Sequence, residues 1–226
     1  WLRERYPAEH AACVFDAKGP TFREGLYPEY KAQRAPMPEP LVQQIEPIHE
    51  IVRLLGWPVL VVPGIEADDV IGTLARQAVA SGHQVVISTG DKDMAQLVDE
   101  RVHLINTMSG HYADPAGVVE KFGVAPERIR DYLTLIGDSV DNVPGVNKVG
   151  PKTAVKWLQE YGSLENIIAH ADEFKGKVGD YLREALEHLP LSYELVTIKC
   201  DVALDLQPET LAFNPEDTET LRELYE

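Results

Sequence analysis

Acidic residues follow three short apolar segments of this sequence and recur in a fourth place. The acids are Asp16 after "ACVF", Glu66, Asp68 and Asp69 after "VLVV", Asp91 and Asp93 after "VVIST", and Asp138 and Asp141 within "GDSVDN". If the apolar segments are strands of one open α/β sheet, their carboxyl ends lie where such sheets bind ligands. We therefore expect these side chains to gather at one edge of a sheet.

Helix capping is the simpler explanation of any one of these acids, because Asp is a favoured N-cap and stabilises the positive end of a helix. Capping, however, needs one acid per junction, and three of these four places carry two or three. Two carboxylates ~5 Å apart repel by about 3 kcal/mol at an effective dielectric of 20. Such a cluster either raises its pKa values or binds cations, and we favour cations.

The donor types indicate which cation. Carboxylates without nearby His or Cys favour Mg²⁺ or Mn²⁺. The seven histidines show no H-x-x-x-H or H-E-x-x-H spacing, which argues against zinc, and no G-x-S-x-G or Cys/His arrangement for a nucleophile is evident. Acidic sites that hold two such ions typically hydrolyse phosphate esters. The acids alone therefore predict metal-dependent phosphoester hydrolysis.

The stretch "NVPGVNKVGPKTAVKWL", residues 142–158, indicates a phosphate contact. It nearly matches a Walker A motif, but Pro151 interrupts the pattern and no strand precedes it. A hairpin between two helices fits better, with Gly145 and Gly150 allowing close backbone approach and Pro151 in the first helical turn. Free N–H groups and the lysines nearby suit a phosphate of a duplex backbone, although lysines are often only solvated.

The segment "YPEYKAQR" places Tyr27, Tyr30, Lys31 and Arg34 close together. Aromatic rings beside cations bind the bases and phosphates of single strands. A solvated polar loop explains the same residues equally well.

Apolar runs that alternate with helical patterns predict an α/β fold, a central, mostly parallel sheet flanked by helices. The predicted strands are 10–15, 58–62, 84–89 and 101–107. A helix with apolar positions from Leu41 to Leu55 and a second helix, stopped by Gly82, lie between them, and an amphipathic helix follows Asp93. Beyond about residue 115 we expect short helices, a brief strand "VALDL" and a closing helix; the short helices are 115–122, 126–136, 151–161, 163–170 and 177–197.

Composition sets wider limits. With 21 basic and 37 acidic residues the formal net charge is −16, which by itself argues against a nucleic-acid ligand unless the acids surround metal ions. Two cysteines, Cys13 and Cys200, suggest no disulfide framework and fit a reducing cytoplasm. No apolar run approaches the ~18 residues of a membrane span, so we expect no membrane partner. Because the sequence opens at Trp1 in what looks like the last turns of a helix, we expect it to be a piece of a longer chain.

Six motifs in order carry a family resemblance. They are "FDAKGPTFR", "YKAQRAPMP", "GIEADDVIGTLA", "STGDKDMAQLV", "GDSVDNVPGVNKVGPKTA" and "LSYELVTIK". With them the chain closely resembles, over nearly its whole length, the 5′-nuclease domain at the start of bacterial DNA polymerase I, a member of the flap-endonuclease family. That resemblance implies Mg²⁺- or Mn²⁺-dependent cleavage of 5′ flaps and removal of nucleotides, RNA primers included, from 5′ ends of duplex DNA. It also implies a bacterial nucleoid-associated enzyme with a polymerase module further along the chain.

The resemblance also assigns residues. It places Asp16, Glu66, Asp68 and Asp69 in a first metal site and Asp91, Asp93, Asp138 and Asp141 in a second, with Asp69 between the two. It implies that Lys31 and Arg34, beside Tyr30, belong to a flexible arch, at about 17–40, that contacts the 5′ strand near the scissile phosphate. It implies a helix-hairpin-helix element at about 138–161 that grips duplex DNA, commonly with K⁺ at its turn; the DNA contacts there are Gly145, Val146, Lys148, Val149, Gly150, Lys152, Thr153 and Lys156.

The predicted domains are an α/β nuclease core, residues 1–112, and a helical region, residues 113–226. The family also has a strand ending in Asp, and a helix with a basic residue, at positions ahead of Trp1. Two alternatives to an active nuclease therefore stay open. One is a branched-DNA binder that does not cut because the metal ligand ahead of Trp1 is missing. The other is a phosphatase of small phosphoesters, which would not need the 142–156 segment.

Overall fold

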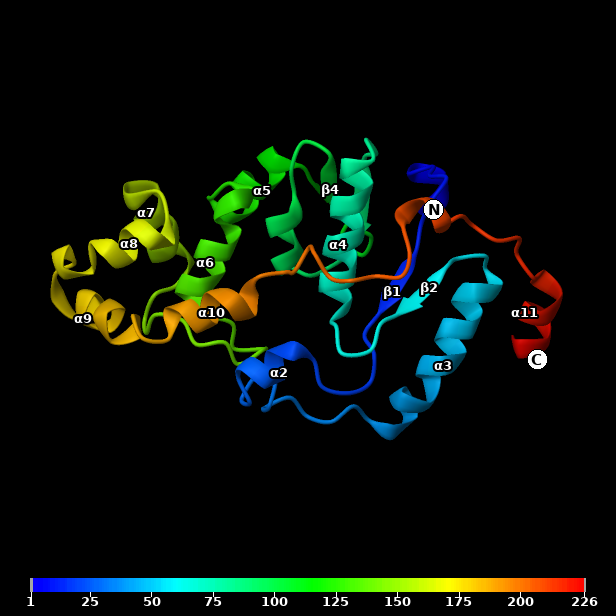
Figure 1. Ribbon diagram of the computed structural model, residues 1–226, viewed down its shortest axis with the longest axis horizontal. Coiled ribbons are helices and arrows are strands. Elements are labelled where there is room, and N and C mark those ends of the chain that lie inside the picture. Colours follow the sequence, from blue (N-terminus) through cyan, green and yellow to red (C-terminus); the bar gives the residue numbers. More distant parts are fainter. Residues whose placement is uncertain (1, 226) are drawn as a thin grey trace. The chain divides into compact units, whose positions relative to one another are not determined.

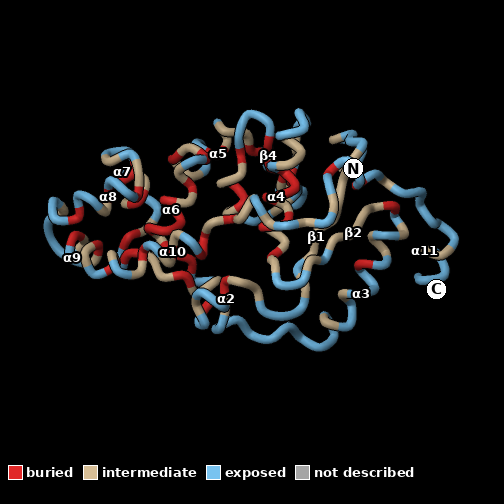
Figure 2. Tube along the Cα trace, viewed as in Figure 1, coloured by how far each residue is buried: buried red, intermediate tan, exposed pale blue. Residues whose placement is uncertain are grey.

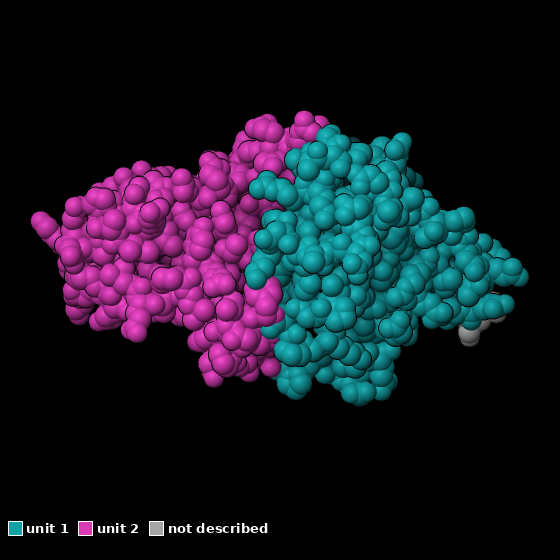
Figure 3. Space-filling model, viewed as in Figure 1, with its two compact units in different colours: residues 1–21, 35–83, 199–226 teal, residues 22–34, 84–198 magenta. Residues whose placement is uncertain are grey.

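The computed structural model describes residues 2–225 and falls into two compact units (Figures 1 and 3). The first unit contains the residues up to Thr21, residues 35–83 and the residues from Lys199 onward. The second contains residues 22–34 and 84–198. The predicted division was a single boundary between residues 112 and 113. The units differ from it because segments far apart in sequence pack into the same unit.

The first unit is built on a parallel pair of strands, β1 (Cys13–Phe15) and β2 (Val59–Val61), with Cys13 opposite Val59. Helix α4 (Ala67–Ala80) follows β2 and buries Val70 and Leu74, which form a core with Leu211. Partly buried apolar side chains from both strands and from the 204–206 segment pack against that core. These contacts fix the start of α4, where three of the predicted acids lie.

Three further helices belong to the first unit: α1 (Leu2–Arg5), α3 (Glu39–Leu54) and α11 (Thr218–Tyr225). Helix α3 begins after Pro38 and has Pro40 in its first turn, where a backbone N–H would have no partner within the helix and proline has none. A short 3₁₀ helix, η4 (Pro208–Thr210), precedes Leu211. The predicted closing helix is confirmed.

The second unit contains a three-stranded sheet of β3 (Val85–Ser88), β4 (Val102–Asn106) and β5 (His111–Ala113). Strands β3 and β4 are parallel, and β4 pairs with β5 in the antiparallel direction. The α/β class is thus confirmed, but the single central sheet is wrong: the strands form two small sheets, one in each unit. Strand β5, which the sequence did not reveal, returns from the tight turn at Asn106–Gly110.

Helices make up the rest of the second unit. Those with bounds not yet given are α2 (Phe22–Leu26), α5 (Pro115–Phe122), α6 (Ile129–Ile136), α7 (Pro151–Tyr161), α8 (Leu164–Ala169), α9 (Gly176–Ala185) and α10 (Leu189–Val196), with the 3₁₀ turns η1 (Asp93–Leu97), η2 (Pro126–Arg128) and η3 (Ala171–Glu173). Helix α6 is the most buried of them, and buried positions gather along it and along β4 in Figure 2. It packs against α7 and α10.

Three secondary-structure predictions are wrong. The helix predicted at 177–197 is two helices, α9 and α10, because Pro190 has no N–H and fits only near the start of a new helix. The stretch "VALDL" forms no strand; its residues Leu204 and Leu206 pack on the first core in irregular backbone. The amphipathic helix after Asp93 is the short 3₁₀ turn η1.

No helix among residues 2–225 is both long enough and apolar enough to span a bilayer.

Candidate metal centre

Asp16 directly follows β1 and caps a helix. Its Oδ1 accepts a hydrogen bond of 2.7 Å from the N–H of Ala67, the first residue of α4. The capping explanation therefore holds for one oxygen of this carboxylate. The residue is exposed.

The remaining acids of the first unit lie in the first turn of α4 or next to it. Glu66 is 9% exposed and accepts a 3.1 Å hydrogen bond from Thr21 Oγ1. Asp69 is fully buried, and its Oδ1 accepts a 2.8 Å hydrogen bond from the N–H of Lys199. A buried carboxylate is tolerated when donors or cations surround it, and the positive end of α4 adds to that support. Asp68, in the same turn, is half-buried, and a hard cation bound by these acids stays a prediction.

In the second unit, Asp91 and Asp93 lie at the end of β3. Asp91 Oδ1 accepts a 2.8 Å hydrogen bond from the N–H of Asp93, which fixes the start of η1. Asp93 Oδ1 is buried, and among the described residues it has no hydrogen-bond partner. Burial, followed by the charge of Asp91, raises the pKa of Asp93 to about 7; Lys92 opposes this shift, and the charges of Asp138 and Asp141 add to it. The four acids predicted for the second site therefore interact electrostatically.

Asp138 is held by the chain itself. Its Oδ1 accepts hydrogen bonds from the N–H groups of Val140 and Asp141, and its Oδ2 lies 2.7 Å from Lys92 Nζ. Burial favours the neutral acid, but the hydrogen bond and charge of Lys92, together with the two N–H groups, lower the pKa of Asp138 below its ordinary value. Asp138 thus stays ionised to a lower pH than an ordinary aspartate does.

Asp141 is surrounded by side chains from residues 27–34. Arg34 forms a short ion pair with its Oδ1, and Lys31 Nζ lies 3.9 Å from its Oδ2. The hydroxyl of Tyr30 donates a 3.2 Å hydrogen bond to the same Oδ2. The resemblance predicted this segment near the reacting phosphate, and the structure places its cations on a predicted metal ligand.

The acids suit a divalent cation in chemistry, since every donor is a carboxylate oxygen and Asp93 has a buried oxygen that a cation would satisfy. Within residues 2–225, however, no group of three or more His, Cys, Asp or Glu side chains is arranged so that it could hold a metal ion. In the second unit, Lys92 contacts Asp138, and Lys31 and Arg34 contact Asp141, through the carboxylate oxygens that would bind an ion. The metal-ligand set therefore stays a prediction.

Tyr30 differs from what the sequence suggested. The proposed role was stacking on an unpaired base, which needs an accessible ring, but Tyr30 is only 4% exposed. Its ring lies under Lys31, whose Nζ is 4.8 Å from the ring centroid. In the structure, the Tyr30 hydroxyl donates a hydrogen bond to Asp141. Lys31 and Arg34, 24% and 48% exposed in their side chains, stay accessible to a phosphate.

The predicted hairpin forms between α6 and α7. Gly137 and Gly145 touch backbone to backbone: a Cβ on Gly145 would lie 2.4 Å from the Gly137 nitrogen. The Val146 N–H donates 2.8 Å to the Leu135 carbonyl, and Val146 and Val149 are buried. These two valine side chains therefore shape the hairpin, and the DNA contacts expected at Val146 and Val149 stay a prediction. Lys148, Lys152 and Lys156 are exposed, with Lys148 in a left-handed turn, φ 61°.

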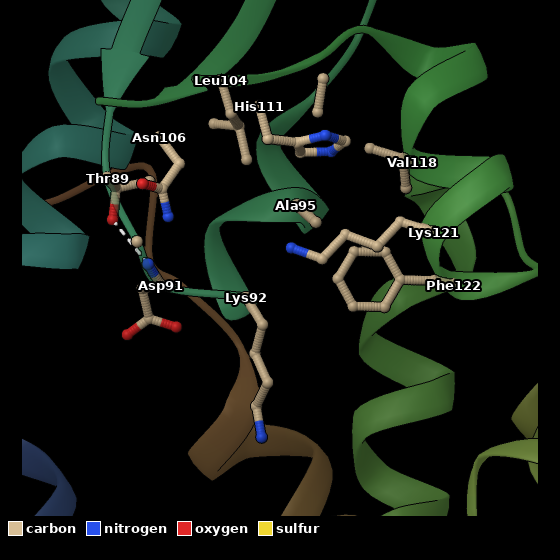
Figure 4. Close-up of a pocket in the computed structure, with 12 residues that line it drawn as sticks. Thr89, Asp91, Lys92, Ala95, Leu104, Asn106, His111, Val118, Lys121 and Phe122 are labelled. Atoms are coloured by element: carbon tan, nitrogen blue, oxygen red, sulfur yellow. Dashed lines mark hydrogen bonds between the residues drawn. The ribbon is translucent and has the colours of Figure 1, made fainter. Parts of the chain in front are cut away.

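A small pocket lies between the end of β3 and α5, with Asn106, His111 and Lys121 among its lining residues (Figure 4). The ends of the Asp91 and Lys92 side chains point away from Lys121 and His111 in this view. Its volume is about 30 Å³, room for about one or two water molecules. The pocket is therefore too small for a nucleotide.

Two residues that the sequence did not single out support the site. Lys92, between Asp91 and Asp93, turns out to be the partner of Asp138. Arg23 is 3% exposed and donates to the carbonyls of Leu195 and Thr197, at 2.9 and 2.8 Å, which anchors the start of the 22–34 segment on the end of α10. A lysine between two acids was a visible signal for Lys92; nothing local indicated the distant carbonyls bound by Arg23.

Comparison with known proteins identifies the family of the chain. A family model for the 5′-3′ exonuclease N-terminal resolvase-like domain matches residues 1–123, and one for the 5′-3′ exonuclease C-terminal SAM fold matches residues 124–219. The chain belongs to the 5′-3′ exonuclease family. Helices α6 and α7, with the hairpin between them, fall in the second of these matches.

Curated relatives cover the chain almost completely. DNA polymerase I of Pseudomonas aeruginosa is 53% identical over 232 residues, which are 99% of this chain and 25% of that protein. A 5′-3′ exonuclease of Aquifex aeolicus is 44% identical over 215 residues, 95% of this chain and 73% of that protein. The chain thus spans about a quarter of the length of its DNA polymerase I relative and most of the length of the shorter exonuclease.

Solved structures share the fold. The 5′-exonuclease of phage T5 with bound zinc superposes with a TM-score of 0.78 at 24% identity, over 86% of this chain and 76% of that one. A T5 flap endonuclease in a pseudo-enzyme–product complex with DNA and metal ions gives a TM-score of 0.76 at 23% identity, over 86% and 76%. At these identities the likeness supports the fold alone.

Proposed function

We propose that this chain is a metal-dependent, structure-specific nuclease that hydrolyses phosphodiester bonds at 5′ flaps and at the 5′ ends of duplex DNA. The observation that carries the proposal is the buried, unpartnered oxygen of Asp93, which interacts electrostatically with Asp91, Asp138 and Asp141 in a chain of the 5′-3′ exonuclease family. Without a cation this arrangement holds like charges close together in a poorly solvated place, which costs free energy. A divalent ion would offset that cost.

Each acidic group has a task in this proposal. Asp16, Glu66, Asp68 and Asp69 hold one divalent ion, and Asp91, Asp93, Asp138 and Asp141 hold another. Bound there, such ions would supply an activated water and stabilise the charge on the attacking and leaving oxygens. The chain itself orients two of the ligands. The N–H of Lys199 holds Asp69, and the N–H groups of Val140 and Asp141, with the ammonium of Lys92, hold Asp138.

The cations have a separate task. Lys31 and Arg34 bind the phosphate of the 5′ strand, and the exposed lysines of the hairpin, Lys148, Lys152 and Lys156, bind the backbone of the duplex without reading its sequence. Terminal nucleotides must unpair to reach the acids, at a cost of a few kcal/mol per base. The phosphate contacts supply part of that free energy. Local positive charge of this kind lets a chain of net charge −16 bind a polyanion.

The finer parts of the proposal are the physiological ion and the partners. We infer Mg²⁺ or Mn²⁺ at the acids from their all-oxygen donor set, and K⁺ at the hairpin turn by family resemblance. RNA primers on DNA are a further expected substrate, in a cytoplasmic, nucleoid-associated setting. A polymerase region in the same protein is supported by the DNA polymerase I relatives, of which this chain spans a quarter.

The test is cleavage of an end-labelled 5′-flap oligonucleotide in Mg²⁺. Asp93→Asn keeps the shape of the side chain and removes its charge, so we expect the rate to fall at least about 100-fold. Asp172→Asn is the matched control, because Asp172 is an exposed acid of the second unit outside the proposed site. Equal rates for the two variants would rule out the proposed role of Asp93.

Flap binding in Ca²⁺, measured on the same proteins, separates the proposal from its main alternative. A nuclease binds the flap in Ca²⁺ and cuts it in Mg²⁺. A branched-DNA binder without catalysis binds the flap in both ions and cuts it in neither. Cleavage of p-nitrophenyl phosphate without flap binding would instead favour a small-molecule phosphatase.

A further inference from the structure

Two turns of the second unit are tied together. We name residues 27–34 the basic turn and residues 138–142 the acidic turn. The Lys31 N–H donates a 2.9 Å hydrogen bond to the Asp141 carbonyl, and Asn142 Nδ2 donates one of 2.7 Å to the Glu29 carbonyl. Lys31 and Asn142 both have left-handed backbone, φ 56° and 59°, which few non-glycine residues adopt without support. The two turns therefore support each other's conformation.

The side chains of the basic turn occupy both oxygens of Asp141. Arg34 pairs with Oδ1, while the Tyr30 hydroxyl and Lys31 Nζ contact Oδ2. Arg34 Nε also donates 3.3 Å to the Val140 carbonyl, and Gln33 donates to the Ser139 carbonyl. A divalent ion that takes Asp141 as ligand competes with these contacts for the carboxylate lone pairs, and the two nearby positive charges repel it.

From these contacts we propose that the basic turn is a latch on Asp141, closed in the free protein and opened by a phosphate strand. The inference deepens the proposed function and rests on it. A phosphate that binds Lys31 and Arg34 takes them from Asp141 and frees its carboxylate for the ion. Ion and phosphate strand therefore bind with positive coupling, and by linkage each raises the affinity of the other. The latch keeps the second ion site weak until a substrate is present.

Amide hydrogen exchange of the basic turn measures directly whether the latch is closed. The N–H groups of Tyr30, Lys31, Ala32 and Arg34 are all hydrogen-bonded, and that of Lys31 bonds to the acidic turn. We expect Mn²⁺ alone to speed exchange of residues 30–34. In Asp141→Asn these residues should exchange fast from the start, and Mn²⁺ should add nothing. Unchanged or slower exchange of the wild-type turn in saturating Mn²⁺ would overturn the latch.

Mn²⁺ affinity, measured by electron paramagnetic resonance of the free ion without DNA, gives the second readout. We expect Lys31→Gln with Arg34→Gln to bind Mn²⁺ about fivefold more tightly than the wild type, or better. Lys175→Gln with Lys177→Gln removes the same charge from exposed positions elsewhere in the second unit and should leave the affinity unchanged. Tyr30→Phe removes a neutral hydrogen bond to Asp141 and changes no charge, and we expect this variant also to bind Mn²⁺ more tightly than the wild type. If the double variant acted only by lowering the positive charge near the acids, Tyr30→Phe would leave the Mn²⁺ affinity unchanged.

The outcomes separate the two proposals. If Mn²⁺ binding depends on Asp93 and Asp141 but neither the double variant nor Tyr30→Phe binds more tightly, the latch is wrong and the proposed function stands. If Mn²⁺ binding depends on neither acid, both are wrong. Ca²⁺ titrations with and without a 5′-flap oligonucleotide complete the test: the flap should tighten Ca²⁺ binding in the wild type, and the double variant should lose that effect.

Discussion

Lys92 Nζ lies 2.7 Å from Asp138 Oδ2, although the lysine follows β3 and the aspartate follows α6. Burial lowers the pKa of Lys92, but the hydrogen bond to Asp138 and the charges of Asp138, Asp93 and Asp91 together raise it above its ordinary value. A cation of the chain thus binds one acid of the second group in the absence of any ion. This pair explains why a lysine stands between Asp91 and Asp93.

Lys92→Met should shift the acid limit of ion binding. Without the Lys92 ammonium, Asp138 loses a hydrogen bond and a positive charge that lower its pKa. The pKa of Asp138 therefore rises, and the carboxylate is protonated at higher pH. We expect the pH at which half of the Mn²⁺ binding is lost to move up. Lys92→Arg, which keeps the charge, should restore the wild-type profile; if Met and Arg behave alike, the pairing has no effect on the ligand.

Asp93→Asn should stabilise the metal-free protein at alkaline pH. The folded pKa of Asp93, about 7, is above its ordinary value of 3.8, so the folded state binds the proton more tightly than the unfolded state. Stability that this residue provides at low pH is lost as the pH rises from about 4 to about 7, and above that window the ionised group is destabilising. Urea unfolding in EDTA at pH 8 should show a gain of about 2 kcal/mol for the variant, and at pH 4 little difference.

A lower stability of Asp93→Asn at pH 8 would contradict this account of the site. Asp172→Asn, an exposed acid, is the control and should change stability by no more than about 0.5 kcal/mol at either pH.

Gly145→Ala and Gly150→Ala should differ sharply although both lie in the hairpin. A Cβ on Gly145 would lie 2.4 Å from backbone atoms of Ile136 and Gly137, whereas a Cβ on Gly150 would meet nothing within 4 Å. We expect Gly145→Ala to cost about 3 kcal/mol or more in unfolding free energy and to weaken duplex binding, with Gly150→Ala close to neutral. Thermal unfolding and duplex binding by anisotropy check this, and equal losses would show that the close approach is unimportant.

Lys31→Ala with Arg34→Ala should slow flap cleavage more than Lys152→Ala. The first pair is placed at a predicted metal ligand, while Lys152 is in the first turn of α7 and contacts only the duplex backbone in the proposal. Under single-turnover conditions we expect the pair to lower the cleavage rate constant, and Lys152→Ala to raise the Kd for the duplex with little change in rate. The same profile for both variants would remove the distinction between the two kinds of contact.

Local signals in the sequence located some elements well. Pro115 and Pro151 in first helical turns, with Gly123 and Gly162 directly after the helices, fixed the bounds of α5 and α7 as predicted. Long-range pairing left no such signal: the single predicted sheet is two small sheets, and "VALDL" has strand-like composition but pairs with no strand among residues 2–225. The acids were recognisable because they recur after apolar segments.

The partners of those acids were not recognisable. Arg34 pairs with Asp141 across 107 positions, and no local pattern encodes such a pair. The burial of Tyr30 depends on the same packing, so composition alone suggested a stacking residue where the structure has a hydrogen-bond donor.

The most direct test of the central claim is anomalous diffraction from crystals of the protein soaked in Mn²⁺. A manganese peak within about 2.5 Å of Asp93 Oδ1, with Asp138 or Asp141 as a second ligand, is the predicted result. The contradicting result is no manganese near Asp93 at full soaking concentration, with Lys92 still bound to Asp138 and Arg34 still bound to Asp141.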